Sequence, residues 1–190
     1  MAHTFDPANA EMLEEVGRYR YCSRDELVGM LPTDGDSVVV DMGSGTGFYT
    51  TDVAPYVGTV YALDVQPVMH AKFLDKGVPE NVDLVTAEAA DLPLASDLAD
   101  AAYSTMTFHE FAGTGALSEI ARVLVPGGRL AVVDWSAAGV GEAGPPPSEL
   151  HDLASATALA ESAGFTVRRG EERPETFALV ADAPASSVPA

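Results

Sequence analysis

Basic side chains are scarce in this sequence. Its 190 residues include 10 Lys and Arg, two of them lysines, against 29 Asp and Glu, and the formal net charge at pH 7 is −19. A chain with this charge repels phosphate backbones and acidic lipid surfaces. We therefore expect no nucleic acid and no membrane among its partners.

The excess of carboxylates is typical of proteins from a salt-rich cytoplasm. At molar salt the Debye length falls to about 3 Å, so repulsion between surface carboxylates is largely screened. We favour this halophilic interpretation over the alternative of an acidic protein from an ordinary cytoplasm, because lysine is nearly absent and carboxylates occur along the whole chain.

Cysteine and long apolar runs are scarce as well. The single Cys22 excludes an intramolecular disulfide framework and a multi-thiolate metal site, and we expect no bound metal. Residues 1–14 lack the basic and apolar segments of a signal peptide, and no apolar run approaches the length of about 18 residues that spans a membrane. Because 47% of the residues are hydrophobic, the chain can bury a sizeable core. We expect a cytoplasmic protein, and the sequence leaves its oligomeric state open.

Short apolar runs of strand type alternate with helical stretches through most of the chain. Nearly continuous apolar strands separated by helices indicate a parallel sheet that is covered on both faces. The sequence therefore predicts an α/β fold with a doubly wound, mostly parallel seven-stranded sheet. Strands are expected at residues 37–41, 59–64, 82–86, 100–106, 129–134, 166–169 and 177–181. Helices are expected at residues 48–55, 67–76, 115–123 and 148–163.

The two ends of the chain differ from this alternation. The last two strands are separated by a few residues around Pro174, too few for a crossover helix, so the last strand should run antiparallel to the others. Before the first strand, residues 9–31 are expected to form one or two helices, within a cap at residues 1–36 that covers the functional edge of the sheet. We predict one domain over residues 1–182 and a flexible tail at residues 183–190.

A glycine-rich turn follows the first strand, at the edge where open parallel sheets bind their ligands. Gly43, Gly45 and Gly47 alternate with Ser44 and Thr46. Glycine at these positions lets the backbone turn sharply and approach a ligand closely. We expect the amides of the turn to be free for a polar or anionic group of that ligand.

Three common glycine motifs do not fit this turn. The dinucleotide fingerprint requires a small residue where Phe48 stands. A P-loop requires Lys followed by Ser or Thr, and no such pair follows the glycines. A nucleophile elbow requires glycines two residues on either side of Ser44, where Met42 and Thr46 stand.

Carboxylates follow three successive strands. Asp41 ends the first strand, Asp64 ends the second, and Glu88 follows the third. Carboxylates at these positions suit a ligand ammonium group, ribose hydroxyls and an adenine amino group, respectively. For Asp64 the alternative is a cap on the helix that begins near Pro67. Together with the glycine turn, these carboxylates indicate a cationic nucleoside ligand.

Four segments of the chain form an ordered set of sequence motifs: residues 39–47 (VVDMGSGTG), 62–65 (ALDV), 88–94 (EAADLPL) and 124–130 (LVPGGRL). In this order they resemble the motifs of class I S-adenosylmethionine-dependent methyltransferases of the small-molecule type, related to the quinone-biosynthesis C-methyltransferases. The resemblance extends over residues 38–134. It implies the Rossmann-like methyltransferase fold, with S-adenosylmethionine as cofactor and S-adenosylhomocysteine as product.

The resemblance also assigns roles to single residues. It implies that Glu88 binds the adenine amino group, that the Ala89 amide binds a ring nitrogen, and that Val65 packs on adenine. Glu88 departs from the Asp that is more usual in the family. The expected cofactor-binding residues are Asp41, Gly43, Ser44, Gly45, Asp64, Val65, Glu88, Ala89 and Thr105.

His109 is the expected catalytic residue. It follows the fourth strand, near the expected position of the methyl group, and histidine is the usual side chain for proton transfer near neutral pH. A merely structural imidazole is the alternative. Asp134, at the end of the fifth strand, is expected either to point toward the acceptor pocket or to cap a turn. Arg18 and Arg20 could hold an anionic acceptor, although a solvated helix face is favoured for both.

The sequence thus predicts an enzyme that transfers a methyl group from S-adenosylmethionine to a small-molecule acceptor. Two alternatives stay open: a nicotinamide-dinucleotide-dependent oxidoreductase, and a cofactor-binding module without catalysis. The residues indicate neither the acceptor nor the atom that is methylated.

Overall fold

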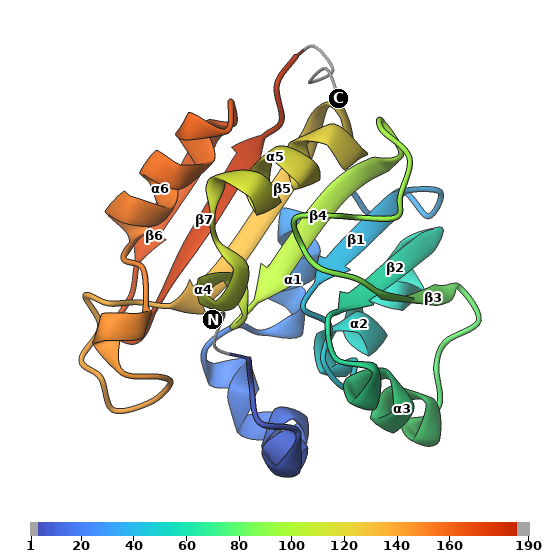
Figure 1. Ribbon diagram of the computed structural model, residues 1–190, viewed down its shortest axis with the longest axis horizontal. Helices are drawn as coiled ribbons and strands as arrows, with labels where there is room; N and C mark the ends of the chain where they lie inside the picture. The colour runs from blue at the N-terminus through green and yellow to red at the C-terminus, as the bar shows by residue number, and fades with distance from the viewer. Residues whose placement is uncertain (1–3, 186–190) are drawn as a thin grey trace.

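The computed structural model of the protein describes residues 4–185, in which helices cover both faces of a seven-stranded sheet (Figure 1). All seven expected strands are present and lie close to their predicted positions. In sheet order they are β3 (Val82–Thr86), β2 (Thr59–Asp64), β1 (Val38–Met42), β4 (Ala99–Thr105), β5 (Leu124–Trp135), β7 (Thr176–Asp182) and β6 (Thr166–Glu172).

An apolar core forms on each face of the sheet. Successive strand residues point to opposite faces, so Val39 joins one core and its neighbour Val40 the other. Figure 1 shows α5 and α6 in front of the sheet, with α1 and α2 behind it. One core takes side chains from α1 (Arg24–Met30), α2 (Phe48–Val53) and α3 (Pro67–Lys76), and the other from α4 (Phe108–Phe111), α5 (Thr114–Val123) and α6 (Leu153–Ser162). In the described part of the chain, four 3₁₀ helices complete the elements: η1 (Pro7–Glu14), η2 (Val16–Arg20), η3 (Ala54–Tyr56) and η4 (Pro147–Glu149).

The strand order reverses at β1. This strand pairs in parallel with β2 on one side and with β4 on the other, and β3 lies beyond β2. At such a reversal the connections leave toward opposite faces and open a crevice at the carboxyl ends of the strands. The glycine-rich turn after β1 therefore lies at the crevice.

The C-terminal strands form the antiparallel hairpin that the short connection around Pro174 predicts. β7 runs antiparallel to both β5 and β6, which lie on either side of it. β6 is longer than expected and reaches Glu172, because Glu171 and Glu172 continue the ladder opposite Ala178 and Phe177. This edge strand has no apolar pattern, so its full length left no signal in the sequence.

β5 begins at Leu124, before its expected start at residue 129. The other differences from the expected elements lie in helices and near the chain ends. The helix expected from residue 148 begins at Leu153, because the side chain of Asp152 caps its amino end. Among residues 4–37, only α1 is an α-helix, and η1 and η2 replace the rest of the expected helical region.

The expected tail falls partly within the described residues. The amide of Ala183 donates to the carbonyl of Gly128, 2.7 Å away. The amide of Gly127 donates to the carbonyl of Pro184. Residues 186–190 of the expected tail lie outside the described residues. No helix within residues 4–185 has the length and apolar character needed to cross a membrane.

Candidate functional site

A cavity of about 400 Å³ opens at the carboxyl ends of the central strands. Its walls come from the turn after β1, the ends of β2 and β4, the segment after β3, and the chain before α1. All nine residues expected to bind a cofactor line it: Asp41, Gly43, Ser44, Gly45, Asp64, Val65, Glu88, Ala89 and Thr105. The fold thus brings together residues that are far apart in the sequence.

The glycine turn has the backbone conformation that its sequence predicts. Gly43, Gly45 and Gly47 have φ angles of +79°, +54° and +80°, in the region that favours glycine. A Cβ atom at Gly43 would overlap the side chain of Thr107, and one at Gly47 would overlap the ring of Phe73. Neighbouring elements therefore pack directly against the backbone of the turn.

Four amides of this turn, those of Gly43, Ser44, Gly45 and Gly47, are engaged within the protein, and for these four the expectation that the turn amides are free was wrong. The amides of Gly43 and Ser44 both donate to the carbonyl of Leu63 at 2.8 Å. The amide of Gly45 donates to Oδ2 of Asp64, also at 2.8 Å. The turn folds back onto the end of β2, so the amides of Gly43, Ser44 and Gly45 already have partners there.

Asp41 is a buried carboxylate at the end of β1. Its Oδ2 accepts hydrogen bonds from Thr50 and Tyr103, at 2.6 Å and 2.9 Å. Its Oδ1 is buried and has no hydrogen-bond partner among the described residues. Burial raises the pKa of Asp41 to about 6, while the two hydroxyl donors oppose the rise. A cation in the cavity would favour the ionised form and supply the missing partner of Oδ1.

Asp64 has both a structural role and a place in the cavity wall. Its Oδ1 accepts from the amide of Gln66 at 2.8 Å, and Oδ2 accepts from Gly45. It thus supports the start of α3, as the capping alternative suggested, although the N-cap position itself belongs to Gln66. Burial raises the pKa of Asp64, and the two backbone donors oppose that rise. Each carboxylate oxygen can accept a further hydrogen bond, so these contacts leave capacity for a ligand.

His109 lies beside the site but is not among the cavity-lining residues. Its Nδ1 lies 3.0 Å from both carboxylate oxygens of Asp134, and its amide donates to Oδ2. Burial would lower the pKa of His109, but the hydrogen bond and the charge of Asp134 outweigh this effect and raise it. Asp134 is fully buried and faces His109 instead of the cavity. Glu110, which follows His109 in the sequence, does line the cavity.

The chain before α1 supplies wall residues that the sequence did not single out. Thr4, Phe5 and Leu13 line the cavity. Arg18 also lines it, with its guanidinium 5.2 Å and 5.1 Å from the ring centres of Phe48 and Tyr49. The solvated position favoured for both arginines is correct for Arg20, which is exposed, and wrong for Arg18.

Polar contacts attach this chain segment to the rest of the protein. Gln66 donates to the carbonyl of Phe5 at 2.9 Å. The carboxylate of Glu14 forms an ion pair of 2.8 Å with Lys76 and accepts a hydrogen bond from Thr46 in the glycine turn. These contacts tie the segment to α3 and to the turn, so the cavity is covered on this side.

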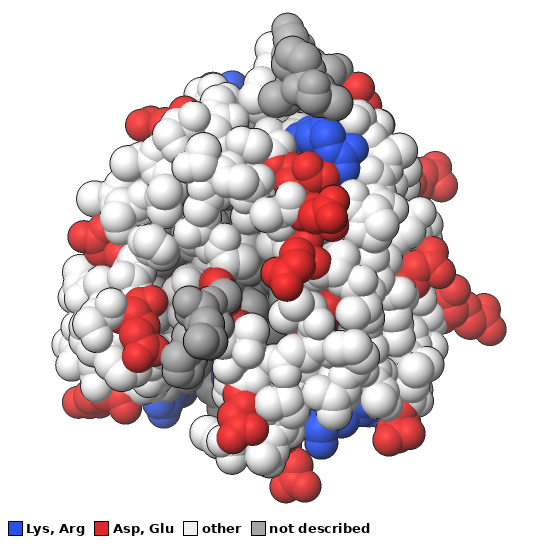
Figure 2. Space-filling view, viewed as in Figure 1, with Lys and Arg blue, Asp and Glu red and all other residues white. Residues whose placement is uncertain are grey.

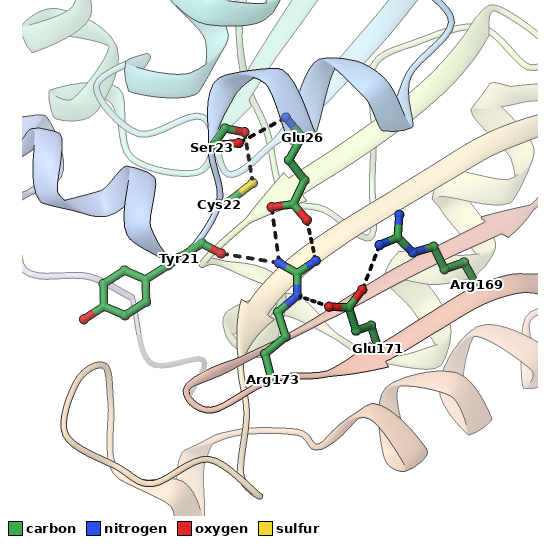
Figure 3. Close-up of polar contacts among 7 residues, drawn as sticks. All are labelled: Tyr21, Cys22, Ser23, Glu26, Arg169, Glu171 and Arg173. Carbon is green, nitrogen blue, oxygen red and sulfur yellow. Dashed lines mark hydrogen bonds and ion pairs between the residues drawn. The ribbon is translucent and has the colours of Figure 1, made fainter.

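A second attachment lies beyond η2 (Figure 3). Arg173, between β6 and β7, pairs with Glu26 of α1 and Glu171 of β6, and it donates to the carbonyl of Tyr21. Its side chain is 14% exposed. This one guanidinium therefore joins the start of α1 to the C-terminal hairpin.

Comparisons with known proteins agree with this geometry. A sequence model of the methyltransferase domain family matches residues 40–132. The crystal structure of an S-adenosylmethionine-dependent methyltransferase from Aquifex aeolicus superposes with a TM-score of 0.87 at 29% identity, covering 95% of this chain and 100% of that one. The chain is thus similar to S-adenosylmethionine-dependent methyltransferases, in sequence over residues 40–132 and in fold over 95% of its length.

Relatives of the chain include a demethylmenaquinone methyltransferase from Corynebacterium kroppenstedtii, 38% identical over 106 residues. An uncharacterized methyltransferase-like protein from Schizosaccharomyces pombe is 37% identical over 104 residues. These matches cover 55% and 54% of this chain, but only 44% and 40% of the relatives. The chain therefore spans less than half the length of either relative.

The cavity residues fit S-adenosylmethionine, the cofactor of the methyltransferases that the chain resembles. The buried Oδ1 of Asp41 and Oγ of Ser44 lack hydrogen-bond partners among the described residues, and S-adenosylmethionine carries an ammonium group and hydroxyls that could bind them. Four Asp and Glu side chains line the cavity, which suits a sulfonium cation and would repel the pyrophosphate of a nicotinamide dinucleotide. The comparisons likewise give no support to the oxidoreductase alternative.

Proposed function

We propose that this protein transfers a methyl group from S-adenosylmethionine to a small-molecule acceptor. The observation that carries the proposal is the unpartnered oxygen of Asp41, buried beside a cavity that Asp64 and Glu88 also line. An anionic wall at the strand ends favours a ligand that combines positive charge with ribose and adenine. The methyltransferases that the chain resembles support the same cofactor.

The residues of the chain would act mainly by binding and alignment. Asp41 would bind the ammonium group, Asp64 the ribose hydroxyls and Glu88 the adenine amino group, while Val65 packs on the adenine ring. When bound, S-adenosylmethionine supplies a methyl group that is already activated by its sulfonium. The protein therefore needs to contribute proximity, orientation and exclusion of water.

We propose that His109 acts as the base when the molecule that receives the methyl group must lose a proton. If neutral His109 donates from Nδ1 to Asp134, its Nε2 carries the free lone pair. A base is required only when the atom that receives the methyl group carries a proton that must leave. The alternative of a structural imidazole predicts that turnover is insensitive to this side chain.

The acceptor is proposed to be a small molecule, and the names of relatives that act in quinone biosynthesis support this class. The acidic surface argues against nucleic acid or an anionic membrane. Figure 2 shows Asp and Glu spread over the face in view, with few Lys and Arg among them.

We also propose a cytoplasmic, salt-adapted protein. Its melting temperature should rise when potassium chloride is added to a salt-free buffer, and a melting temperature independent of salt would contradict the adaptation.

Ligand-dependent melting tests the cofactor, and product analysis tests the reaction. In high salt, S-adenosylhomocysteine should raise the melting temperature and NAD should leave it unchanged. A shift with NAD alone would favour the oxidoreductase. Incubation of the protein with S-adenosyl[methyl-²H₃]methionine and a small-molecule cell extract should give a product heavier by a labelled methyl group. Cofactor binding without any labelled product, across extracts of the source organism, would favour the non-catalytic module.

A further inference from the structure

β6 is the outer strand at one edge of the sheet. It pairs with β7 on one side, and among residues 4–185 no strand lies on its other side. Every residue of β6 is exposed except Val167, which is half-buried. The backbone groups along its outer side therefore have no strand partner, and an edge of this kind can pair with another chain.

The charges of β6 are arranged symmetrically about Gly170. Arg168 and Arg169 precede this glycine, and Glu171 and Glu172 follow it. Arg169 and Glu171 form an ion pair of 2.7 Å along the strand (Figure 3). Their side chains are 55% and 45% exposed. Both charges are thus open to solvent, and each has room for a second partner.

This order of charges selects one way in which two copies of β6 can pair. Residues directly opposite each other in an antiparallel pair point to the same face of the sheet. When a twofold axis relates the copies, the residue at the axis lies opposite its own counterpart. An axis at any of the four charged residues would place like charges opposite each other, which destabilises a strand pair. An axis at Gly170 instead places Arg169 opposite Glu171 of the second copy.

Charged side chains and bulges normally keep edge strands from pairing, and β6 has both. Its irregularity lies between Val167 and Arg169, near the start of the strand. Residues 169–172 keep a regular register with β7, so the centre of the strand is fit for pairing on its outer side. Its charges then act as a filter, because they oppose most partners and match a second copy of the same strand.

The helix beside β6 is compatible with a second copy. α6 packs on this strand, since a Cβ atom at Gly170 would lie 3.2 Å from Leu153 of the helix. Ala154 and Ala158 are exposed on α6, and Glu161 is its one charged residue. A twofold axis at Gly170 brings the α6 helices of both copies to the same face of the combined sheet, where small uncharged side chains permit a close approach.

We propose that the protein forms a symmetric dimer in which the β6 strands of two copies pair antiparallel about Gly170. The two sheets then form one continuous sheet, held by main-chain hydrogen bonds and by two contacts between Arg169 of one copy and Glu171 of the other. No residue of β6 is among the described residues that line the cavity, so both cavities stay open. The net charge of −19 opposes association, and salt screens this repulsion.

Charge-reversal variants test the dimer and its register together. In the proposed dimer, Arg169→Glu and Glu171→Arg each place only like charges opposite one another. An equimolar mixture of the two variants restores opposite charges in both contacts. The matched control is Arg24→Glu, which makes the same change of charge at an exposed position of α1.

Sedimentation equilibrium in high salt compares the mass of each sample with the chain mass of 19.8 kDa, and thermal melting shows whether each variant is folded. The wild-type protein and Arg24→Glu should dimerise with a dissociation constant on the order of 10 μM, as expected for a small interface. Each β6 variant alone should raise that constant at least about tenfold, because like charges then meet across the axis. The mixture should dimerise about as tightly as the wild-type protein.

Hydrogen exchange of the wild-type protein needs no variant and gives the answer should Glu171→Arg fail to fold. Amides of residues 168–172 should exchange more slowly at protein concentrations above the dissociation constant than below it. Amides of β3, at the other edge of the sheet, should exchange equally at both concentrations.

Three results would overturn the proposal. A wild-type protein that stays monomeric at about ten times the expected dissociation constant, or whose β6 exchanges equally at both concentrations, does not form this dimer. A dimer that both β6 variants retain would lie on another surface. Two folded variants that are monomeric both alone and mixed would show that Arg169 and Glu171 do not meet across the axis. All three results would leave the proposed function untouched, because binding of S-adenosylhomocysteine tests it separately.

Discussion

The hydroxyl group of Tyr103 donates a hydrogen bond of 2.9 Å to Oδ2 of Asp41, and both side chains are buried within the sheet. The bond runs from the middle of β4 to the end of β1. It favours the ionised form of Asp41 against the effect of burial. Tyr103 thereby tunes the charge that we propose to bind the ligand ammonium group.

Cofactor affinity should therefore depend on pH. Because burial raises the pKa of Asp41 to about 6, the carboxylate gains a proton as the pH falls through that value. A cationic group binds the ionised form, so affinity for S-adenosylhomocysteine should fall by up to about tenfold per pH unit below the pKa. Tyr103→Phe removes a donor to the carboxylate and should move this decline to higher pH. Calorimetry over a pH series measures both effects, and Tyr56→Phe, which removes an exposed hydroxyl group, is the control. Identical curves of affinity against pH for the wild-type protein and Tyr103→Phe would contradict the account.

The glycine turn should not tolerate a methyl group. Gly43→Ala places Cβ against the side chain of Thr107 at a positive φ angle, and should lower the free energy of unfolding by about 1–3 kcal/mol. Gly29→Ala is the matched control, because it lies in α1 with no atom within 4 Å of the added carbon. Urea denaturation at fixed salt compares them. Equal stability of the two variants would show that the turn is looser than its geometry indicates.

Removal of the Asp134 charge should lower the pKa of His109. The hydrogen bond and charge of Asp134 are what raise that pKa against the effect of burial. NMR titration of the imidazole in Asp134→Asn should show the fall, and Glu149→Gln, which removes a weaker influence, should show a smaller one. An unchanged titration midpoint in Asp134→Asn would mean that the pair is not coupled as the distances imply.

Loss of the Arg173 guanidinium should loosen the segment before β1. Arg173→Gln breaks the ion pair with Glu26 and the hydrogen bond to Tyr21, and should cost about 1–3 kcal/mol because this pair is partly buried. Arg169→Gln removes an exposed ion pair with Glu171 and should cost less than about 1 kcal/mol. Hydrogen exchange should report faster opening of α1 in Arg173→Gln only. If both variants exchange alike, Arg173 does not anchor the segment.

The sheet, and the meeting of most candidate site residues in one cavity, were predictable because they depend on local patterns. Apolar runs marked the strands, and short connections fixed their directions. Carboxyl ends of neighbouring parallel strands share one edge, so Asp41, Asp64 and Glu88 had to meet once the strands were recognised. No three-dimensional information was needed for these steps.

Contacts between distant segments explain what the sequence did not predict. Arg18 lies in the cavity wall because Glu14 pairs with Lys76 and Arg173 pairs with Glu26, and neither pairing leaves a periodic signal. His109 turns toward Asp134 because that buried carboxylate accepts both its amide and its imidazole hydrogen bonds. The turn amides were misjudged because the carbonyl of Leu63 lies within their reach. Partners of this kind become visible only when the chain is folded.

Titration of S-adenosylhomocysteine into the folded protein by calorimetry tests the central claim most directly. The measurement uses the wild-type protein, Asp64→Asn and the control Asp83→Asn, an exposed carboxylate on β3, all at neutral pH and high salt. The account predicts that the wild-type protein and the control bind the ligand with equal affinity, and that Asp64→Asn binds it about 10- to 100-fold more weakly. Absence of binding heat with the wild-type protein, or an Asp64→Asn variant with undiminished affinity, would contradict it.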